Sequence, residues 1–314
     1  MADNGGNWER ETIEKLAFAA LREQRRARLW GIFFKILTFA YITFLIVVAM
    51  DWKATSEPRT GTHTALVEVS GLIGPGTDAS AEKVMAALNS AFKDKGTRGV
   101  VVRINSPGGS PVQAQAIYDE MRRLRQKYPT IPLYAVVEDV CASGGYFVAA
   151  GADRIYVARS SIVGSIGVRM DGFGFTGLME KLGVERRLLT AGDNKGLLDP
   201  FLPVDEKQRA HVTGMIGEIH EQFIAVVREG RGKRLVESPD MFSGLIWTGE
   251  KSIGLGLADA LGSLDFVARE VIKAEDIVDY TQKENIAEKL ARRIGASMAG
   301  ALADVMLGQS PALR

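Results

Sequence analysis

The sequence predicts an α/β domain built on a mostly parallel sheet, with one transmembrane helix ahead of it. Two patterns indicate this class. From residue 65 onward, short apolar runs alternate with segments of helical spacing, and such a β-α-β succession favours parallel strands covered by helices. Earlier in the chain, the 22 residues at 29–50 carry only one charged side chain, Lys35, and this apolar length is enough to cross a bilayer.

The alternating pattern predicts three strands and three helices in one domain without internal repeats. The strands are expected at 65–69, 99–104 and 133–137, and the helices at 81–92, 112–127 and 205–229.

The end of the chain has a weaker helical pattern at 281–306, where strong apolar residues become sparse. We therefore expect the domain at 65–275 and a C-terminal helical extension and tail at 276–314.

The N-terminal segments differ in charge. Residues 1–28 hold six basic side chains, whereas only Lys53 and Arg59 follow the apolar stretch closely, so the positive-inside rule places the N-terminus in the cytoplasm. The basic segment 1–28 fits an amphipathic helix on the inner leaflet and a solvated flank equally well. The polar residues 51–64 are expected to be a linker. No A-x-A site follows the apolar stretch, so we expect an uncleaved anchor in the lipid bilayer of the inner membrane, with the domain on the periplasmic, extracytoplasmic side.

Composition argues against several classes of function. Lys and Arg number 39 against 38 Asp and Glu, so the chain lacks the basic surplus that binding to nucleic acid requires. The three histidines are scattered, and the sequence has no CxxC or HExxH motif, which argues against a metal site. We expect no nucleic-acid partner, no metal and no other cofactor.

A serine follows one of the apolar runs at a strand-to-helix turn. Ser143 precedes Gly144 and Gly145, which permit the tight turn that exposes a nucleophile. The N–H of Gly144 could bind a developing oxyanion. Taken alone, this pattern fits a helix-capping serine better than a nucleophile. Cys141 is a rival nucleophile, but its apolar neighbours favour a buried position.

A second Gly-rich turn, NSPGGS at residues 105–110, lies one β-α-β unit earlier. The carboxyl ends of neighbouring parallel strands lie at the same edge of a sheet, so the two turns are expected to flank one cleft. Gly109 lets a backbone amide reach a substrate carbonyl, and Gly108 lets the chain turn. Locally, an ordinary Pro-Gly turn is the favoured interpretation of this pattern.

The motifs NSPGGS, ASGGYFVA, GSIGV and AGDNK occur in this order. In series they resemble the short form of the signal peptide peptidase A family, and the resemblance covers roughly residues 66–264. It implies the fold of the Clp protease and crotonases, with repeated βαβ units and a mostly parallel sheet. It also implies a serine endopeptidase in which Ser143 is the nucleophile, Lys195 the general base and Ser165 a residue that orients the lysine.

Such a Ser-Lys dyad requires a neutral lysine. The amine pKa must fall from about 10.4 to near 7, which burial can achieve. The apolar neighbours Leu197 and Leu198 could bury Lys195, whereas Asp193 or Asp199 held close would keep it charged. Some family members have a serine in place of Asp199.

The resemblance also implies partners. These are peptide substrates, namely signal peptides left in the membrane after precursor processing, and further copies of the chain in a homo-oligomer, with an octamer expected and a dyad that neighbouring subunits can share. In this reading the amides of Gly109 and Gly144 hold the oxyanion. Two alternatives stay open: a crotonase-type acyl-CoA enzyme that uses the same turns, and an inactive membrane scaffold, which Asp199 suggests.

Overall fold

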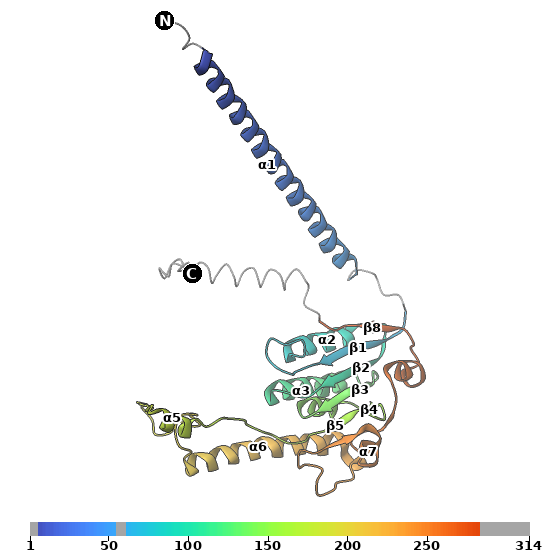
Figure 1. Ribbon diagram of the computed structural model, residues 1–314. Coiled ribbons are helices and arrows are strands. Elements are labelled where there is room, and N and C mark those ends of the chain that lie inside the picture. The colour runs from blue at the N-terminus through green and yellow to red at the C-terminus, as the bar shows by residue number, and fades with distance from the viewer. Residues whose placement is uncertain (1–5, 55–60, 283–314) are drawn as a thin grey trace. The chain divides into compact units, whose positions relative to one another are not determined.

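The computed structural model describes residues 6–54 and 61–282. The chain forms two compact units. The described part of the first is one long helix, α1 (Gly6–Ala54), and the described part of the second, at residues 61–282, is an α/β domain (Figure 1). The helical pattern expected at 281–306 lies outside the described residues, apart from its first two positions.

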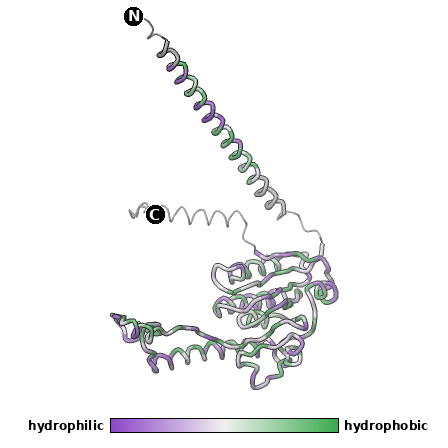
Figure 2. Tube along the Cα trace, in the orientation of Figure 1, coloured by the Kyte–Doolittle hydropathy of each residue, from purple (hydrophilic) through white to green (hydrophobic). Residues whose placement is uncertain are grey.

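Helix α1 runs without a break through the basic segment and the apolar stretch, which sequence analysis treated as separate parts. Within its described side chains, one segment, Glu11–Leu45, is long and apolar enough to span a membrane by length and composition. Figure 2 shows hydrophilic residues mainly in the first half of this helix and hydrophobic ones later. The helix also includes residues 51–54, which were expected in the linker, because helix propagation is cooperative and meets no proline before Pro58.

The domain contains both long and single-turn helices. They are α2 (Ala81–Lys93), α3 (Pro111–Lys127), α4 (Gly144–Ala149), α5 (Thr176–Leu182), α6 (Glu206–Arg231), the 3₁₀ turn η1 (Gly232–Arg234), α7 (Gly249–Gly254), α8 (Leu264–Phe266) and the π-helical turn η2 (Val267–Ile272).

Eight strands form one sheet in the described domain. They are β1 (His63–Ser70), β2 (Thr97–Ser106), β3 (Leu133–Ala142), β4 (Arg154–Val157), β5 (Ile162–Gly164), β6 (Ile246–Thr248), β7 (Ala260–Leu261) and β8 (Ile277–Asp279).

The sheet order is β6-β5-β3-β2-β1-β8, with β4 pairing with β3 and β7. Every pairing is parallel except β5 with β6, which is antiparallel. Strand β3 pairs with two strands along the same edge: its first half pairs with β4, and its last three residues pair with β5. The expected α/β class with a mostly parallel sheet is confirmed.

Burial on both faces of the sheet explains why the sequences of the three central strands are apolar runs. Alternate residues of β1, β2 and β3 lie in a large buried cluster with α2, α3 and α4, and the other face carries a smaller cluster around Val101, Val136 and Val267. Both faces are therefore covered along much of the strands, as parallel sheets require. This packing fixes the carboxyl ends of β2 and β3, where the two Gly-rich turns begin.

Candidate active site

Ser143 lies between the end of β3 and the start of α4. Its backbone has φ 52° and ψ −122°, a conformation that residues with a side chain rarely adopt. Two hydrogen bonds hold the turn: the Ser143 N–H donates to the Gly164 oxygen at 2.8 Å, and the Phe147 N–H donates to the Ser143 oxygen at 3.0 Å. Strain of this kind is found at functional sites, where the surrounding structure maintains it.

The loop of Gly108 and Gly109 packs directly against this turn. A Cβ atom on Gly108 would lie 2.7 Å from the Cβ of Ser143, and one on Gly109 would lie 2.0 Å from the oxygen of Ile73. Hydrogen bonds from Ile73 N to Gly108 O and from Ser110 N to Ile73 O, both 2.8 Å, fix the loop. Glycine is needed here for close approach of two backbones, as well as for the positive φ of both residues.

Two backbone amides near Ser143 have no hydrogen-bond acceptor among the described residues. They are the N–H groups of Gly109 and Gly144. A Cβ atom on Gly144 would lie 3.2 Å from the Gly109 nitrogen, so the two loops meet at this point. Two free amides beside a serine hydroxyl are the arrangement that stabilises a tetrahedral oxyanion in acyl transfer.

These groups border a pocket of about 800 Å³. Gly108, Gly109, Ser143 and Gly144 are among its lining residues. The rest of the wall is mostly apolar and comes from the loop after β1, from the loop between β2 and α3, from α3, from α4, from residues 167–169 and from α6. These lining residues are Leu72, Pro107, Pro111, Val112, Ala114, Gln115, Phe147, Gly167, Val168, Arg169, Ile219, Gln222 and Phe223.

Sequence analysis did not single out the α6 side of the pocket. Phe223 is 4% exposed, and its ring centroid lies 5.0 Å from that of Phe147 on α4. A helix was expected at 205–229, and Ile219, Phe223 and Val226 recur within it at helical spacing, but nothing in that spacing indicates which loop this face meets.

Ser165 lies next to Ser143 across the sheet. The register pairs Ala142 with Gly164, so the two serines follow directly at the ends of paired strands β3 and β5. Ser165 also has a positive φ, 51°, and its N–H donates to the Leu245 oxygen at 2.7 Å. The structure thus brings Ser143, Ser165, Gly109 and Gly144 into one region.

Lys195 lies elsewhere in the single chain. It is exposed on the loop between α5 and α6, its N–H donates to the Gly192 oxygen at 3.1 Å, and it does not line the pocket of Ser143. Leu197 and Leu198 are 37% and 52% exposed. One copy of the chain therefore does not supply the apolar surroundings that a neutral lysine requires.

Asp199, which could oppose a neutral lysine, has other partners. The Phe201 N–H donates to its carboxylate at 2.9 Å, and Arg186 pairs with it at 3.0 Å. The backbone hydrogen bond from Phe201 and the pairing with Arg186 lower the pKa of Asp199. The carboxylate is thus held ionised in a local turn.

Cys141, His211 and His220 are the other side chains of a reactive type that sequence analysis considered. Cys141 is completely buried, as expected, and burial raises the pKa of its thiol, which disfavours the thiolate. His211 and His220 both lie on α6, and His220 Nε2 is 3.3 Å from the Ile166 oxygen. Within residues 6–54 and 61–282, no three His, Cys, Asp or Glu side chains form a group that could hold a metal ion.

Comparison with known proteins places this arrangement in a family. The model for peptidase family S49 matches residues 125–278, and the model for Clp protease matches residues 67–163. A putative protease of Synechocystis is 32% identical over 214 residues, which cover 68% of this chain and 74% of that protein. The chain belongs to peptidase family S49. The Clp protease match agrees with the family's expected fold, and the expected relation to signal peptide peptidase A is confirmed.

Two further relatives of this S49 chain differ in length. A putative signal peptide peptidase SppA of Enterococcus faecium is 28% identical over 200 residues, which are 64% of this chain and 58% of that protein. A Na⁺/H⁺ antiporter NhaA of Brucella melitensis is 48% identical over 177 residues, which are 56% of this chain and 24% of that protein. The antiporter name describes a protein of which the matched part is about a quarter, and in both cases the chain spans less than two thirds of its relative.

Proposed function

We propose that this chain is a membrane-anchored serine endopeptidase with Ser143 as its nucleophile. The observation that carries the proposal is the strained backbone of Ser143 beside the two unpaired amides of Gly109 and Gly144, at one side of an apolar pocket. Membership of a peptidase family supports the same reaction class. A helix-capping serine would not explain the strain, and the Ser143 side chain caps no N–H here.

The proposed reaction has two steps. In the first, the neutral amine of Lys195 takes the Ser143 Oγ proton as Oγ attacks the peptide carbonyl carbon, and the amides of Gly109 and Gly144 hold the oxyanion. The C–N bond then breaks, and the ammonium returns its proton to the leaving amine. In the second, a water molecule gives a proton to the amine as it attacks the acyl ester carbon. The C–Oγ bond then breaks, the ammonium returns its proton to Ser143 Oγ, and the carboxyl product leaves. Ser165 is proposed to orient the lysine.

We propose that Lys195 acts on Ser143 of a neighbouring copy in a homo-oligomer, for which the family resemblance suggests an octamer. The single chain leaves Lys195 exposed and away from the pocket. The segment around it exposes large apolar side chains, with Phe173 81% and Leu189 96% exposed, and such clusters mark interaction surfaces. Burial of this segment against a second copy would supply the desolvation that a neutral lysine needs.

The proposed substrates are apolar peptides, in particular signal peptides that remain in the membrane after precursor processing. The apolar wall of the pocket suits apolar side chains. Helix α1, as a single-pass anchor with the N-terminus in the cytoplasm, would hold the domain at the outer side of the inner membrane, close to such peptides.

Complementation between two inactive variants tests the shared dyad. Ser143→Ala and Lys195→Ala are each expected to lose cleavage of a fluorogenic apolar peptide by the full chain in detergent. Co-expressed in equal amounts, they should recover roughly a quarter of the wild-type rate. In a head-to-tail ring each site takes its serine from one subunit and its lysine from the next, and about one site in four has both intact. Cys141→Ala is the matched control, since a buried cysteine that takes no part in the reaction should leave cleavage intact.

Three outcomes would contradict parts of the proposal. Two inactive variants that do not complement would place the dyad within one chain, and an active Lys195→Ala variant would remove the lysine as the base. A wild-type protein whose Ser143 does not react with a fluorophosphonate would favour the inactive scaffold or the acyl-CoA enzyme, which binding to immobilised CoA would then separate.

A further inference from the structure

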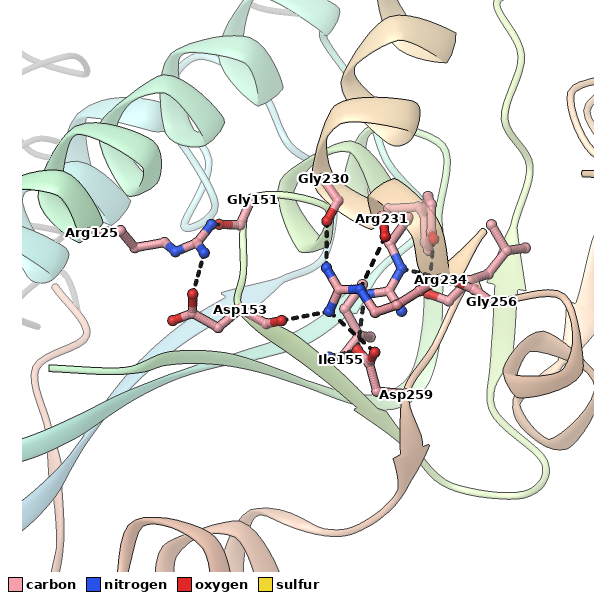
Figure 3. Close-up of polar contacts among 11 residues, drawn as sticks. Arg125, Gly151, Asp153, Ile155, Gly230, Arg231, Arg234, Gly256 and Asp259 are labelled. Atoms are coloured by element: carbon pink, nitrogen blue, oxygen red, sulfur yellow. Dashed lines mark hydrogen bonds and ion pairs between the residues drawn. The ribbon is translucent and has the colours of Figure 1, made fainter. Parts of the chain in front are cut away.

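A cluster of five charged side chains lies where the end of α6 reaches the sheet (Figure 3). They come from α3, from the turn before β4, from the end of α6, from η1 and from the turn before β7. Its members are Arg125, Asp153, Arg231, Arg234 and Asp259, and we call this group the α6 anchor.

Arg231 is the buried centre of the α6 anchor. It is the last residue of α6 and only 1% exposed. Its Nε donates to the Gly256 oxygen at 2.7 Å, and its Nη1 donates to Asp259 at 2.9 Å. A buried charge costs free energy unless it is paired in good geometry, so this position fixes where the end of α6 can lie.

Asp259 joins the buried arginine to the sheet. One carboxylate oxygen accepts from both Arg231 and the Ile155 N–H of β4, the latter at 2.7 Å, and the other accepts from Arg234 at 3.2 Å. Burial alone would raise the pKa of Asp259, but the hydrogen bond and charge of Arg231 lower it below its ordinary value of 3.8. The carboxylate is therefore ionised at neutral pH and holds both arginines.

The remaining contacts join α6 to the helix that follows Ser143. Arg234 donates to the backbone oxygens of Asp153 at 2.7 Å and Gly230 at 2.6 Å. A Cβ atom on Gly230 would lie 2.1 Å from the oxygen of Ala150, so α6 touches the end of α4 backbone to backbone. The C-terminal end of α6 and the C-terminal end of α4 are thus one rigid junction.

The rest of α6 projects from this junction. From Glu206 to Glu218 only Val212 is buried, whereas the last third of the helix is mostly buried. The helix carries Phe223 into the pocket and begins shortly after the loop of Lys195. Over about 37 Å from Arg231 to Glu206, a tilt of about 5° would move the far end by about 3 Å. Small changes at the α6 anchor are therefore amplified at the loop.

We propose that Arg231 and Asp259 are positioning residues that fix the direction of α6, and so place the pocket wall and the Lys195 loop for catalysis. The kinetic part of this inference rests on the proposed peptidase function. The structural part, the fixed direction of α6, can be measured without any activity.

The test compares Asp259→Asn with a matched control, Glu237→Gln, in the full chain in detergent. Glu237 pairs with Arg228 one turn earlier on α6 through two hydrogen bonds of 2.8 Å, but both side chains are about half exposed. Spin labels at Lys207→Cys on α6 and Gln126→Cys on α3 report the direction of the helix, because both positions are exposed and Cys141 is buried. Dilution with unlabelled protein restricts the measured distances to one chain.

We expect Asp259→Asn to broaden the distance distribution and to lower kcat about tenfold, with KM changed less than about threefold, since misplacement of about 1 Å can cost a hundredfold. Glu237→Gln should leave the distance distribution and kcat unchanged. A folded Asp259→Asn protein with the wild-type distribution overturns the inference. If Asp259→Asn does not fold, Arg231→Lys decides, because it keeps the buried positive charge but loses the guanidinium that donates to both Asp259 and the Gly256 oxygen. A smaller broadening supports the inference, and an unchanged distribution overturns it.

If the wild-type protein cleaves nothing, the proposed function fails while the distances still decide whether the α6 anchor fixes the helix. If it cleaves and the distances broaden without a loss of kcat, the positioning role is wrong and the peptidase proposal stands.

Discussion

At the scale of single residues, the candidate site depends on positions where a side chain cannot be added. Gly109 has φ 149° and meets the backbone oxygen of Ile73, a buried residue in a parallel bridge with it. Gly76 is a useful contrast because its φ is also positive, 74°, but nothing lies within 4 Å of the place where its Cβ would be. A comparison of substitutions at these two glycines therefore separates the free-energy cost of a steric clash from the free-energy cost of backbone strain.

Gly109→Ala should therefore destabilise the domain by about 2–3 kcal/mol, from overpacking and strain together. It should also abolish labelling of Ser143 by a fluorophosphonate, since the displaced loop would no longer present its amide to the oxyanion. Urea denaturation of the detergent-solubilised chain measures the first effect, and fluorescent labelling under folded conditions measures the second.

Gly76→Ala is the control for strain alone and should cost about 1 kcal/mol with labelling preserved. Equal losses of stability in the two variants would show that strain, and not contact with Ile73, accounts for the glycine at residue 109.

At the scale of elements, apolar spacing predicted the long elements well, and the structure shows the caps that begin two of them. Helix α3 was expected at 112–127 and begins at Pro111, where the Ser110 hydroxyl accepts from the Gln113 N–H. Helix α6 was expected at 205–229 and begins after Asp205, whose side chain accepts from the Gln208 N–H at 2.8 Å. These local signals suffice because each long element buries one regular face.

Other elements could not be read from spacing. Strand β3 continues to Ala142, five residues beyond its expected end at 137, because its last residues pair with β5, which is only three residues long. No helix or strand was expected at residues 165–204, whose apolar side chains are largely exposed in one copy of the chain. Sequence spacing reports burial within one chain, so it could place Ser143 and its two glycines at one sheet edge but not the lysine.

The two ends of α6 should differ strongly in their contribution to stability. Phe223→Ala removes a ring that is 4% exposed and packed against Phe147, and we expect a loss of about 3–4 kcal/mol as a cavity opens. Met215→Ala, two turns earlier with 38% exposure, should cost about 0.5 kcal/mol. Urea denaturation checks both, and similar losses would mean that the projecting part of α6 is buried in solution, as contact with another copy would bury it.

At the scale of the whole molecule, the chain combines a long helix that contains an apolar stretch and an α/β domain. The described side chains of this helix, at Glu11–Leu45, are all exposed. An isolated helix with many exposed apolar side chains is unfavourable in water, whereas a bilayer satisfies both its backbone and its side chains. The composition of a cleaved signal sequence would be similar, so the two cases need an experiment.

We expect the intact chain to stay with the membrane after an alkaline carbonate wash. Leu37→Asp combined with Phe44→Asp should release it or block its insertion, because each charge within the hydrocarbon costs about 3 kcal/mol. The matched change Leu16→Asp with Phe18→Asp alters the basic flank outside residues 29–50 and should leave the chain in the membrane. Mass spectrometry of the purified protein tests the alternative. A chain that begins after residue 50 would show that the apolar stretch is a cleaved signal, and the domain would then not be anchored by α1.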